Sequence, residues 1–357
     1  MRGRRYDESD VRVRPGRGSR PRTKQRPAHE DAEAALVIGV DRGRYAVLVD
    51  PAGPDEHPAT AMKARELGRE RVVPGDRVDL VGDTSGDEGT LARIVRIQER
   101  RTVLRRTADD TDPVERVIVA NADQLVVVTA LADPEPRTRM IDRCVVAAYD
   151  AGMDVLLCLT KADLASADEL VAMYAPIGVR VVVTRRGDGG AIVGLDDVRA
   201  ALEGRVSVLV GHSGVGKSTL VNALVPDARR ATGVVNDVTG RGRHTSTSAV
   251  ALRVPGGAPT WVIDTPGVRS FGLAHVDPAH LARAFPDLAE VVAECPRGCT
   301  HADDAPDCEL DVWIAEAADD ETRDARRVRV ESFRRLLASR TGAADADPRE
   351  AGAERRP

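Results

Sequence analysis

The spacing of apolar residues changes along the chain and first predicts an all-β region near the amino end. Between residues 34 and 106, short runs rich in β-branched residues are separated by Gly, Pro and Asp turns. The predicted strands are residues 36–40, 45–49, 77–81 and 91–98. This spacing favours a small closed barrel of the OB type, whose face commonly binds oligonucleotides, although such a barrel can also act as a spacer.

Beyond Ala120 the pattern becomes one of apolar strands alternating with amphipathic helices. Strands are predicted at 124–131, 155–159, 179–183, 206–210 and 260–263, with helices at 138–151 and 219–224 between them. Such alternation predicts an α/β domain in which helices cover both faces of a parallel sheet.

From about Asp277 the chain is predicted to be largely helical except around its clustered Cys and His residues, with helices expected at 311–318 and 322–339. We therefore divide the chain into a basic arm at 1–33, an OB-type domain at 34–106, an α/β domain at 107–276, a helical domain at 277–340 and a tail at 341–357. The arm and the tail lack hydrophobic periodicity, so we expect both to be disordered on their own.

Charge is distributed unevenly. The chain carries 52 Lys and Arg against 57 Asp and Glu, but its first 26 residues hold ten basic residues against three acidic ones. The arm can thus be a solvated tail or a segment that orders on a polyanion. The net charge of -5 does not exclude a nucleic-acid partner.

Apolar runs in the chain are all shorter than the roughly 20 residues that span a bilayer. The Arg-rich amino end also lacks the apolar stretch of a secretory signal. We therefore expect a cytoplasmic protein without a membrane partner, and we expect it to be a monomer.

The strand at 206–210 leads into a segment typical of a phosphate-binding loop, and a helix follows. Glycines let backbone amides curl around phosphate oxygens, and the helix amino terminus adds partial positive charge. Lys217 is expected to bridge the outer phosphates and Ser218 to bind Mg²⁺. The predicted nucleotide contacts of this loop are Gly211, His212, Ser213, Gly214, Val215, Gly216, Lys217, Ser218 and Thr219.

A second part of the same site follows the strand at 260–263. Here Asp264 can hold Mg²⁺ through water, and the amide of Gly267 can contact the γ-phosphate. Asp and Gly are ordinary turn residues, so the pair alone is a weak signal. The phosphate-binding loop about 50 residues upstream strengthens it considerably.

Between these parts lies a polar segment, residues 239–248, that has no apolar residue to anchor it. Thr245, or alternatively Thr247, is expected to bind Mg²⁺ and close over the γ-phosphate, as switch segments do. A Gly/Arg-rich segment can instead contact RNA constitutively, and the two roles are compatible.

The strand at 155–159 ends in Thr160, Lys161, Ala162 and Asp163, which has the form of a guanine-reading motif. A carboxylate at Asp163 accepts hydrogens from guanine N1 and N2, which adenine cannot offer, while the stem of Lys161 covers the ring. Thr160 stands where Asn is more frequent, so we expect a weaker brace toward the phosphate-binding loop. Thr184 and Arg185 stand where a fifth nucleotide-binding loop is expected.

The order of these motifs is unusual, because Asp163 precedes Lys217 whereas small GTPases place the phosphate-binding loop first. All of the loops leave the carboxyl edge of one parallel sheet. A circular permutation therefore preserves the site while moving the chain ends.

Three cysteines and one histidine gather within 14 residues of the helical region: Cys295, Cys299, His301 and Cys308. Three thiolates and one imidazole suffice for a closed tetrahedral site, and zinc is its natural occupant. Since no position remains for water, we expect one structural zinc ion per chain. The helix at 322–339 places Arg323, Arg327 and Arg334 near one face, either as a solvated face or as a contact with a phosphate backbone.

These residues give the chain a specific resemblance to the RsgA (YjeQ) family, over residues 34–338. It rests on residues 120–124, the permuted Thr160–Asp163 motif, the loop at 211–218, residues 240–245, Asp264–Gly267, residues 285–287 and the Cys/His cluster. The resemblance implies a GTPase that assists late assembly of the small (30S) ribosomal subunit, binds its rRNA and leaves when GTP is hydrolysed to GDP. The family usually spaces its first two cysteines one residue wider than Cys295 and Cys299.

Hydrolysis of GTP is expected to rest on positioning and charge neutralisation by Lys217, Thr245 and Gly267. Val268 stands where a water-orienting Gln is often found, which predicts slow intrinsic turnover, and His244 is our candidate for that role. The alternatives are a P-loop ATPase or kinase, which Asp163 disfavours, and an RNA-binding scaffold with a structural nucleotide site, which intact Lys217 and Asp264 disfavour.

Overall fold

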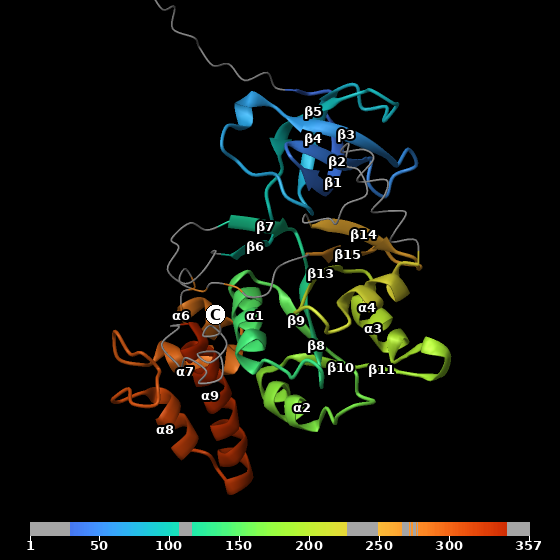
Figure 1. Cartoon of the computed structure of the whole chain (residues 1–357). Helices are drawn as coiled ribbons and strands as arrows, with labels where there is room; N and C mark the ends of the chain where they lie inside the picture. The colour runs from blue at the N-terminus through green and yellow to red at the C-terminus, as the bar shows by residue number, and fades with distance from the viewer. Residues whose placement is uncertain are drawn as a thin grey trace, which may run out of the picture. The chain divides into compact units, whose positions relative to one another are not determined.

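The computed structural model describes residues 29–106, 116–226, 249–265, 271, 273, 276 and 278–340 (Figure 1). Most of the predicted arm, the tail at 341–357 and three expected site residues, His244, Thr245 and Gly267, lie outside these ranges. Within the described residues, no helix combines the length and apolar character needed to cross a bilayer.

A closed five-stranded barrel forms the amino-terminal region. Its strands are β1 (Glu33–Asp41), β2 (Arg44–Val49), β3 (His57–Lys63), β4 (Arg77–Gly82) and β5 (Ala92–Ile97). They follow the order β1-β2-β3-β5-β4, and β4 pairs again with β1, which closes the barrel in the predicted OB arrangement. Alternate residues such as Val37, Val47 and Leu80 fill its interior.

Strand β3 is the barrel strand that the hydrophobic pattern did not predict. Its sequence, His-Pro-Ala-Thr-Ala-Met-Lys, contains one β-branched residue, Thr60. The side chains that it buries are the small ones of Ala59 and Ala61. A strand that contributes only methyl groups to a crowded barrel interior leaves a weak signal in the sequence.

A short hairpin and a parallel sheet follow the barrel. The hairpin consists of β6 (Val103–Arg106) and β7 (Arg116–Ala120). The sheet runs in the order β10 (Arg180–Val183), β9 (Asp154–Thr160), β8 (Gln124–Ala130), β13 (Val206–Val210), β15 (Thr260–Asp264) and β14 (Val250–Val254), and only β14 is antiparallel to its neighbour. Every residue of β8 is buried, because helices cover both faces of the sheet.

Helices cover this sheet as the pattern predicted. On one face, α1 (Thr138–Asp150), α2 (Asp168–Tyr174) and the short η3 (Ala175–Ile177) bury Ile141, Val145 and Tyr174. On the other face, α3 (Leu195–Leu202) and α4 (Lys217–Leu224) pack through Val198 and Leu220. Between β10 and α3 lie a small hairpin, β11 (Arg185–Arg186) and β12 (Ile192–Val193), and η4 (Asp188–Gly190).

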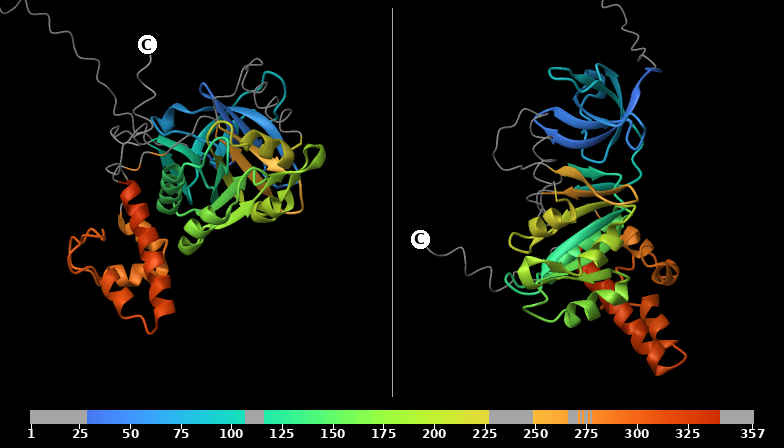
Figure 2. Two further views of the ribbon diagram at one scale, coloured as in Figure 1. Left: turned by 60° about the horizontal axis from the view of Figure 1, so that its bottom comes forward. Right: turned by 90° about the vertical axis from the view of Figure 1, so that its right-hand side faces the viewer.

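The carboxy-terminal region comprises α6 (Pro278–Arg283), α7 (Pro286–Ala293), α8 (Glu309–Ala315) and α9 (Asp320–Arg340). In Figures 1 and 2 the long helix α9 lies beside α8. The Phe285 ring meets those of Tyr149 and Phe333 edge to face, with centroid separations of 5.5 and 5.6 Å. These helices therefore share one apolar core with α1 and the sheet.

Candidate nucleotide-binding site and metal centre

Three predicted motifs meet at the carboxyl edge of the parallel sheet. Strand β9 ends at Thr160, β13 ends just before Gly211, and β15 ends at Asp264. Strands β13 and β15 are direct neighbours, and β8 separates β13 from β9. The topology thus assembles the phosphate and base motifs at one edge despite their permuted order.

The phosphate-binding loop adopts a conformation that its glycines make possible. Gly216 has φ of 91° immediately before α4, in the left-handed region that favours glycine. A Cβ atom at Gly211 would lie 2.6 Å from the carbonyl oxygen of Val128, so the loop passes too close to β8 for any side chain. The side chain of Val215 is buried in the apolar core on the α3 and α4 side of the sheet, and this burial anchors the loop.

Lys217 and Asp264 lie in contact across this edge. The ammonium of Lys217 donates a hydrogen bond to Oδ1 of Asp264, and both side chains are largely buried. The hydroxyl of Thr265 donates to the carbonyl of Leu209 at 2.7 Å, which fixes the end of β15 against β13. The structure therefore brings together the Lys that is expected to bind phosphates and the acidic residue that is expected near Mg²⁺.

Thr160 braces the base motif against the phosphate-binding loop. Its buried hydroxyl donates to the carbonyl of Val215 at 2.7 Å. A threonine hydroxyl thus supplies a link that we expected to be weakened by the loss of the more frequent Asn. Thr184 supports the same strand from the other side, since its amide donates to the carbonyl of Leu159 at 2.7 Å.

Replacing Thr160 with Val is expected to weaken GTP binding about 5- to 10-fold, because the Val215 carbonyl loses its donor and remains in a buried position. Thr160→Ser keeps the hydroxyl and is the matched control. Titration with a fluorescent guanine nucleotide measures both variants. Equal affinities in Thr160→Val and the parent would show that this hydrogen bond does not brace the site.

Asp163 is held as a carboxylate that faces a cavity. Its Oδ1 accepts the backbone amide of Arg186 at 3.0 Å, and this hydrogen bond is the main reason why its pKa is lowered. The cavity has a volume of about 410 Å³. It is lined by Thr160, Lys161, Asp163, Leu164, Thr184, Arg185, Arg186, Gly190, Ile192, Gly214, Gly216, Thr219 and Leu220.

The connection between β8 and α1 also contacts these motifs, although no role was predicted for it. Lys161 donates to the carbonyl of Asp133, and Arg137 lies 3.3 Å from Nε2 of His212 in the phosphate-binding loop. A Cβ atom at Gly214 would lie 3.5 Å from Cδ of Pro134, so this connection passes close to the phosphate-binding loop. This connection directly follows a central strand, at the sheet edge where ligands bind, and that position is the signal that could have identified it as part of the site.

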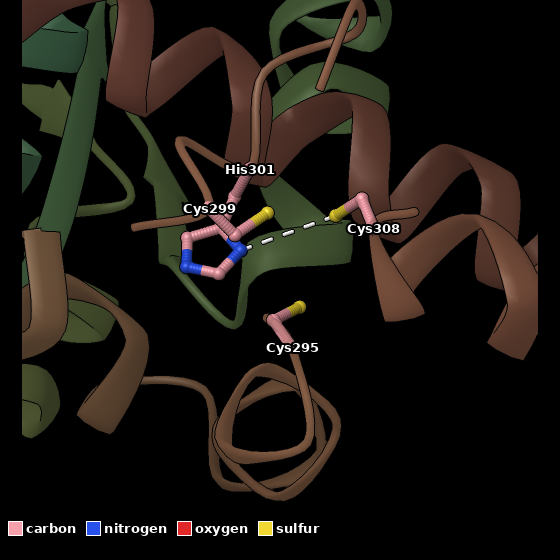
Figure 3. Close-up of side chains that lie close together, drawn as sticks. All are labelled: Cys295, Cys299, His301 and Cys308. Carbon is pink, nitrogen blue, oxygen red and sulfur yellow. Dashed lines mark hydrogen bonds between the residues drawn. The ribbon is translucent and has the colours of Figure 1, made fainter. Parts of the chain in front are cut away.

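The four predicted metal ligands converge in space (Figure 3). Cys295 and Cys299 follow α7, His301 lies in the next loop, and Cys308 immediately precedes α8. Their ligand atoms all lie within 4.8 Å of one another. Sulfur ligands at about 2.3 Å from a tetrahedral zinc ion lie about 3.8 Å apart, so a metal ion requires only small movements of these side chains.

Burial changes the pKa values of two side chains of this cluster. Burial raises the pKa of Cys295 to about 11, and the neighbouring Cys308 and Cys299 thiols add to the effect. Burial and the nearby Arg334 lower the pKa of His301, which keeps the imidazole neutral, the form that binds metal. A divalent cation is what would allow three thiolates to coexist here, so the four side chains could bind zinc.

Arg334 has a structural role instead of facing a phosphate backbone. Its side chain is 10% exposed and pairs with Asp311, and its Nε donates to the carbonyl of His301 at 3.0 Å. Arg334 therefore links the loop that carries His301 to α9. The expectation that Arg334 lies with Arg323 and Arg327 on one solvated or phosphate-binding face is wrong. Arg327 is more exposed and pairs with Asp324 on its own helix.

Comparison with known proteins relates the whole arrangement to one family. The family model described as RsgA GTPase matches residues 97–274. The chain is 35% identical over 279 residues to the small ribosomal subunit biogenesis GTPase RsgA 1 of Vibrio vulnificus, which covers 76% of this chain and 75% of that protein. It is 37% identical to the small ribosomal subunit biogenesis GTPase RsgA of Pseudomonas aeruginosa over 67% of this chain and 69% of that protein.

Two solved structures share the fold. YjeQ from Thermotoga maritima superposes with a TM-score of 0.59 at 24% identity, covering 86% of this chain and 99% of that one. YloQ, described as a circularly permuted GTPase, gives 0.61 at 22% identity, covering 90% and 99%. The fold of the chain, over 86% and 90% of its length, is thus one that solved structures already show.

Proposed function

The chain belongs to the RsgA family of GTPases, and from that premise we propose that it acts on the small (30S) ribosomal subunit during its assembly. The observation that carries this proposal is the convergence of Asp163, Lys217 and Asp264 at one sheet edge. Relatives of similar length are named for the same role, which supports the subunit as the partner.

Each described residue has a separate task in the proposed reaction. The Asp163 carboxylate reads guanine N1 and N2, and the Thr160 hydroxyl keeps that strand in register with the phosphate-binding loop. Lys217 exchanges its contact with Asp264 for the outer phosphates of GTP. Mg²⁺, which Ser218, Thr245 and Asp264 would hold, supplies charge neutralisation on those phosphates.

The barrel and the Arg-rich arm are proposed to contact rRNA. Exposed arginines of the barrel include Arg42, Arg44, Arg65, Arg69 and Arg93. Basic side chains of this kind bind phosphates without reading sequence. The Cys/His cluster is proposed to hold one structural zinc ion, which would order the loop between α7 and α8.

The test of this function is single-turnover hydrolysis of GTP and ATP by the full chain, with and without purified small subunits. We expect GTP to be hydrolysed slowly by the free protein and faster with the subunit. Hydrolysis of ATP at an equal rate would favour a general P-loop ATPase. Absence of hydrolysis with the subunit present would favour a scaffold with a structural nucleotide.

His244→Ala is expected to retain GTP and subunit binding but to lose about 10²-fold of the stimulated rate, as with other lost orienting groups. The same single-turnover assay with saturating subunits measures the loss. Full stimulation of this variant would exclude His244 as the group that orients water. Lys217→Ala serves as the contrasting variant, because it is expected to fail already at nucleotide binding.

A further inference from the structure

The cavity that Asp163 faces is lined in part by the small hairpin of β11 and β12. In this hairpin Arg186 lies directly opposite Ile192, and both residues line the cavity. Val193, the next residue of β12, does not line it. Successive side chains of a strand point to opposite faces, so only one of the two apolar residues of β12 can face the cavity. The hairpin thus presents Ile192, but not Val193, to the cavity.

Backbone contacts at both ends fix this hairpin to the base motif and to the sheet. The Arg186 amide donates to Oδ1 of Asp163 at 3.0 Å. The Ala162 amide donates to the carbonyl of Thr184, the residue immediately before β11, at 3.1 Å. After β12, a Cβ atom at Gly194 would lie 2.4 Å from a carbonyl oxygen at the end of β10, so the chain leaves the hairpin in close contact with that strand. Ile192 is therefore held at a defined position relative to Asp163.

The cavity combines one carboxylate with large apolar side chains. Leu164, Ile192 and Leu220 line it together with Asp163. Leu164 is 58% exposed, more than any other large apolar side chain in the described part of the chain. An apolar side chain exposed at a cavity becomes buried when a ligand fills that cavity. A volume of about 410 Å³ with apolar walls and one carboxylate suits a flat heterocycle that offers hydrogen-bond donors at its edge.

We propose that Ile192 is a base-binding residue whose side chain packs on the guanine ring, while Asp163 reads the edge of the same ring. This rests on the proposed function, because it requires guanine to bind at Asp163. The carboxylate discriminates between bases, and Ile192 contributes affinity for the ring regardless of the groups at its edge. Asp163 has a second role here, since it also holds the hairpin through the Arg186 amide.

Ile192→Ala is expected to weaken GTP binding about 5- to 20-fold. Each buried methylene group is worth about a fourfold change in an equilibrium constant, and this substitution removes Cγ1, Cγ2 and Cδ1, which the ring covers in part. The loss should be the same for GDP and ITP, because the contact involves neither the γ-phosphate nor the amino group of guanine. With saturating GTP, kcat should stay within about twofold of the parent, since a contact made equally in the ground and transition states affects binding only.

Val193→Ala is the matched control. It shortens the adjacent side chain of the same strand, which is 43% exposed and does not line the cavity, so its affinities should equal those of the parent. Ile192→Leu keeps an apolar side chain of the same volume and should bind GTP within about twofold of the parent. Titrations with GTP, GDP and ITP, together with single-turnover hydrolysis, measure each variant.

Parental GTP affinity in Ile192→Ala would overturn the proposal. So would equal losses of affinity in Ile192→Ala and Val193→Ala, or a loss for GTP that ITP does not share. If Ile192→Ala does not fold, Ile192→Val takes its place, with an expected loss of about 2- to 4-fold, and parental affinity in that variant would overturn the proposal equally. The parent is titrated with ATP in the same series, so equal binding of GTP and ATP by the parent would refute the proposed function separately.

Discussion

Asp163→Asn is expected to lower GTP affinity roughly 10³-fold and to admit xanthine nucleotides. The Asn amide replaces one acceptor by a donor, which opposes the N1 and N2 hydrogens of guanine but suits the oxygen at position 2 of xanthine. The Arg186 amide that now holds the carboxylate can still bond the Asn oxygen, so the strand end should keep its shape. Competition titrations with GTP, XTP and ATP measure the change.

Asp188→Asn is the control for this variant. Asp188 is an exposed carboxylate in the adjacent η4 turn and does not line the cavity, so its replacement makes the same change of charge without touching the base. Its nucleotide preference should match that of the parent. GTP binding by Asp163→Asn at the parental affinity would show that the carboxylate does not read the base.

Removal of zinc is expected to unfold the loop between α7 and α8, at a local cost on the order of 10 kcal/mol. The freshly purified protein should contain about one zinc ion per chain, held by the four clustered side chains. Chelation should raise hydrogen exchange at residues 294–316 and leave GTP affinity nearly unchanged, because the cluster lies outside the cavity that contains Asp163. Metal analysis combined with hydrogen exchange makes the measurement.

Cys308→Ser and Cys144→Ser separate this effect from the general loss of a buried thiol. Both cysteines are buried, but Cys144 lies in α1 outside the cluster. Only Cys308→Ser should lose the metal. Zinc content near zero in the unchelated parent, or equal zinc content in the two variants, would refute the assignment.

Elements with strong apolar runs could be predicted from the sequence. Strand β13 begins and ends at the predicted residues, and α1 differs from its prediction by one residue, because continuous burial leaves a continuous apolar pattern. The loops that follow such strands could be predicted as sites for the same reason. Strand β3 could not, since it contributes only small side chains to the barrel.

Contacts between distant segments were beyond what the sequence could predict. The bond from Thr160 to the Val215 carbonyl depends on a separation that only the folded strands define. Arg334 shows the same difficulty, because helical periodicity places it on a face but does not reveal that Asp311 and the His301 carbonyl lie opposite. A basic residue near a predicted surface is therefore weak evidence for a nucleic-acid contact.

The pairing of β1 with β14 joins the barrel to the outer strand of the α/β sheet. Strand β14 closes the α/β sheet, and it buries Val250, Leu252 and Val254. On its outer side, Val250 lies opposite Gly39 of β1, where the barrel begins. Without residues 29–106, β14 would present an open apolar edge, the kind of surface on which chains aggregate. The barrel strands therefore continue the sheet beyond β14, and at Val250 the edge of β14 meets another strand of the same chain.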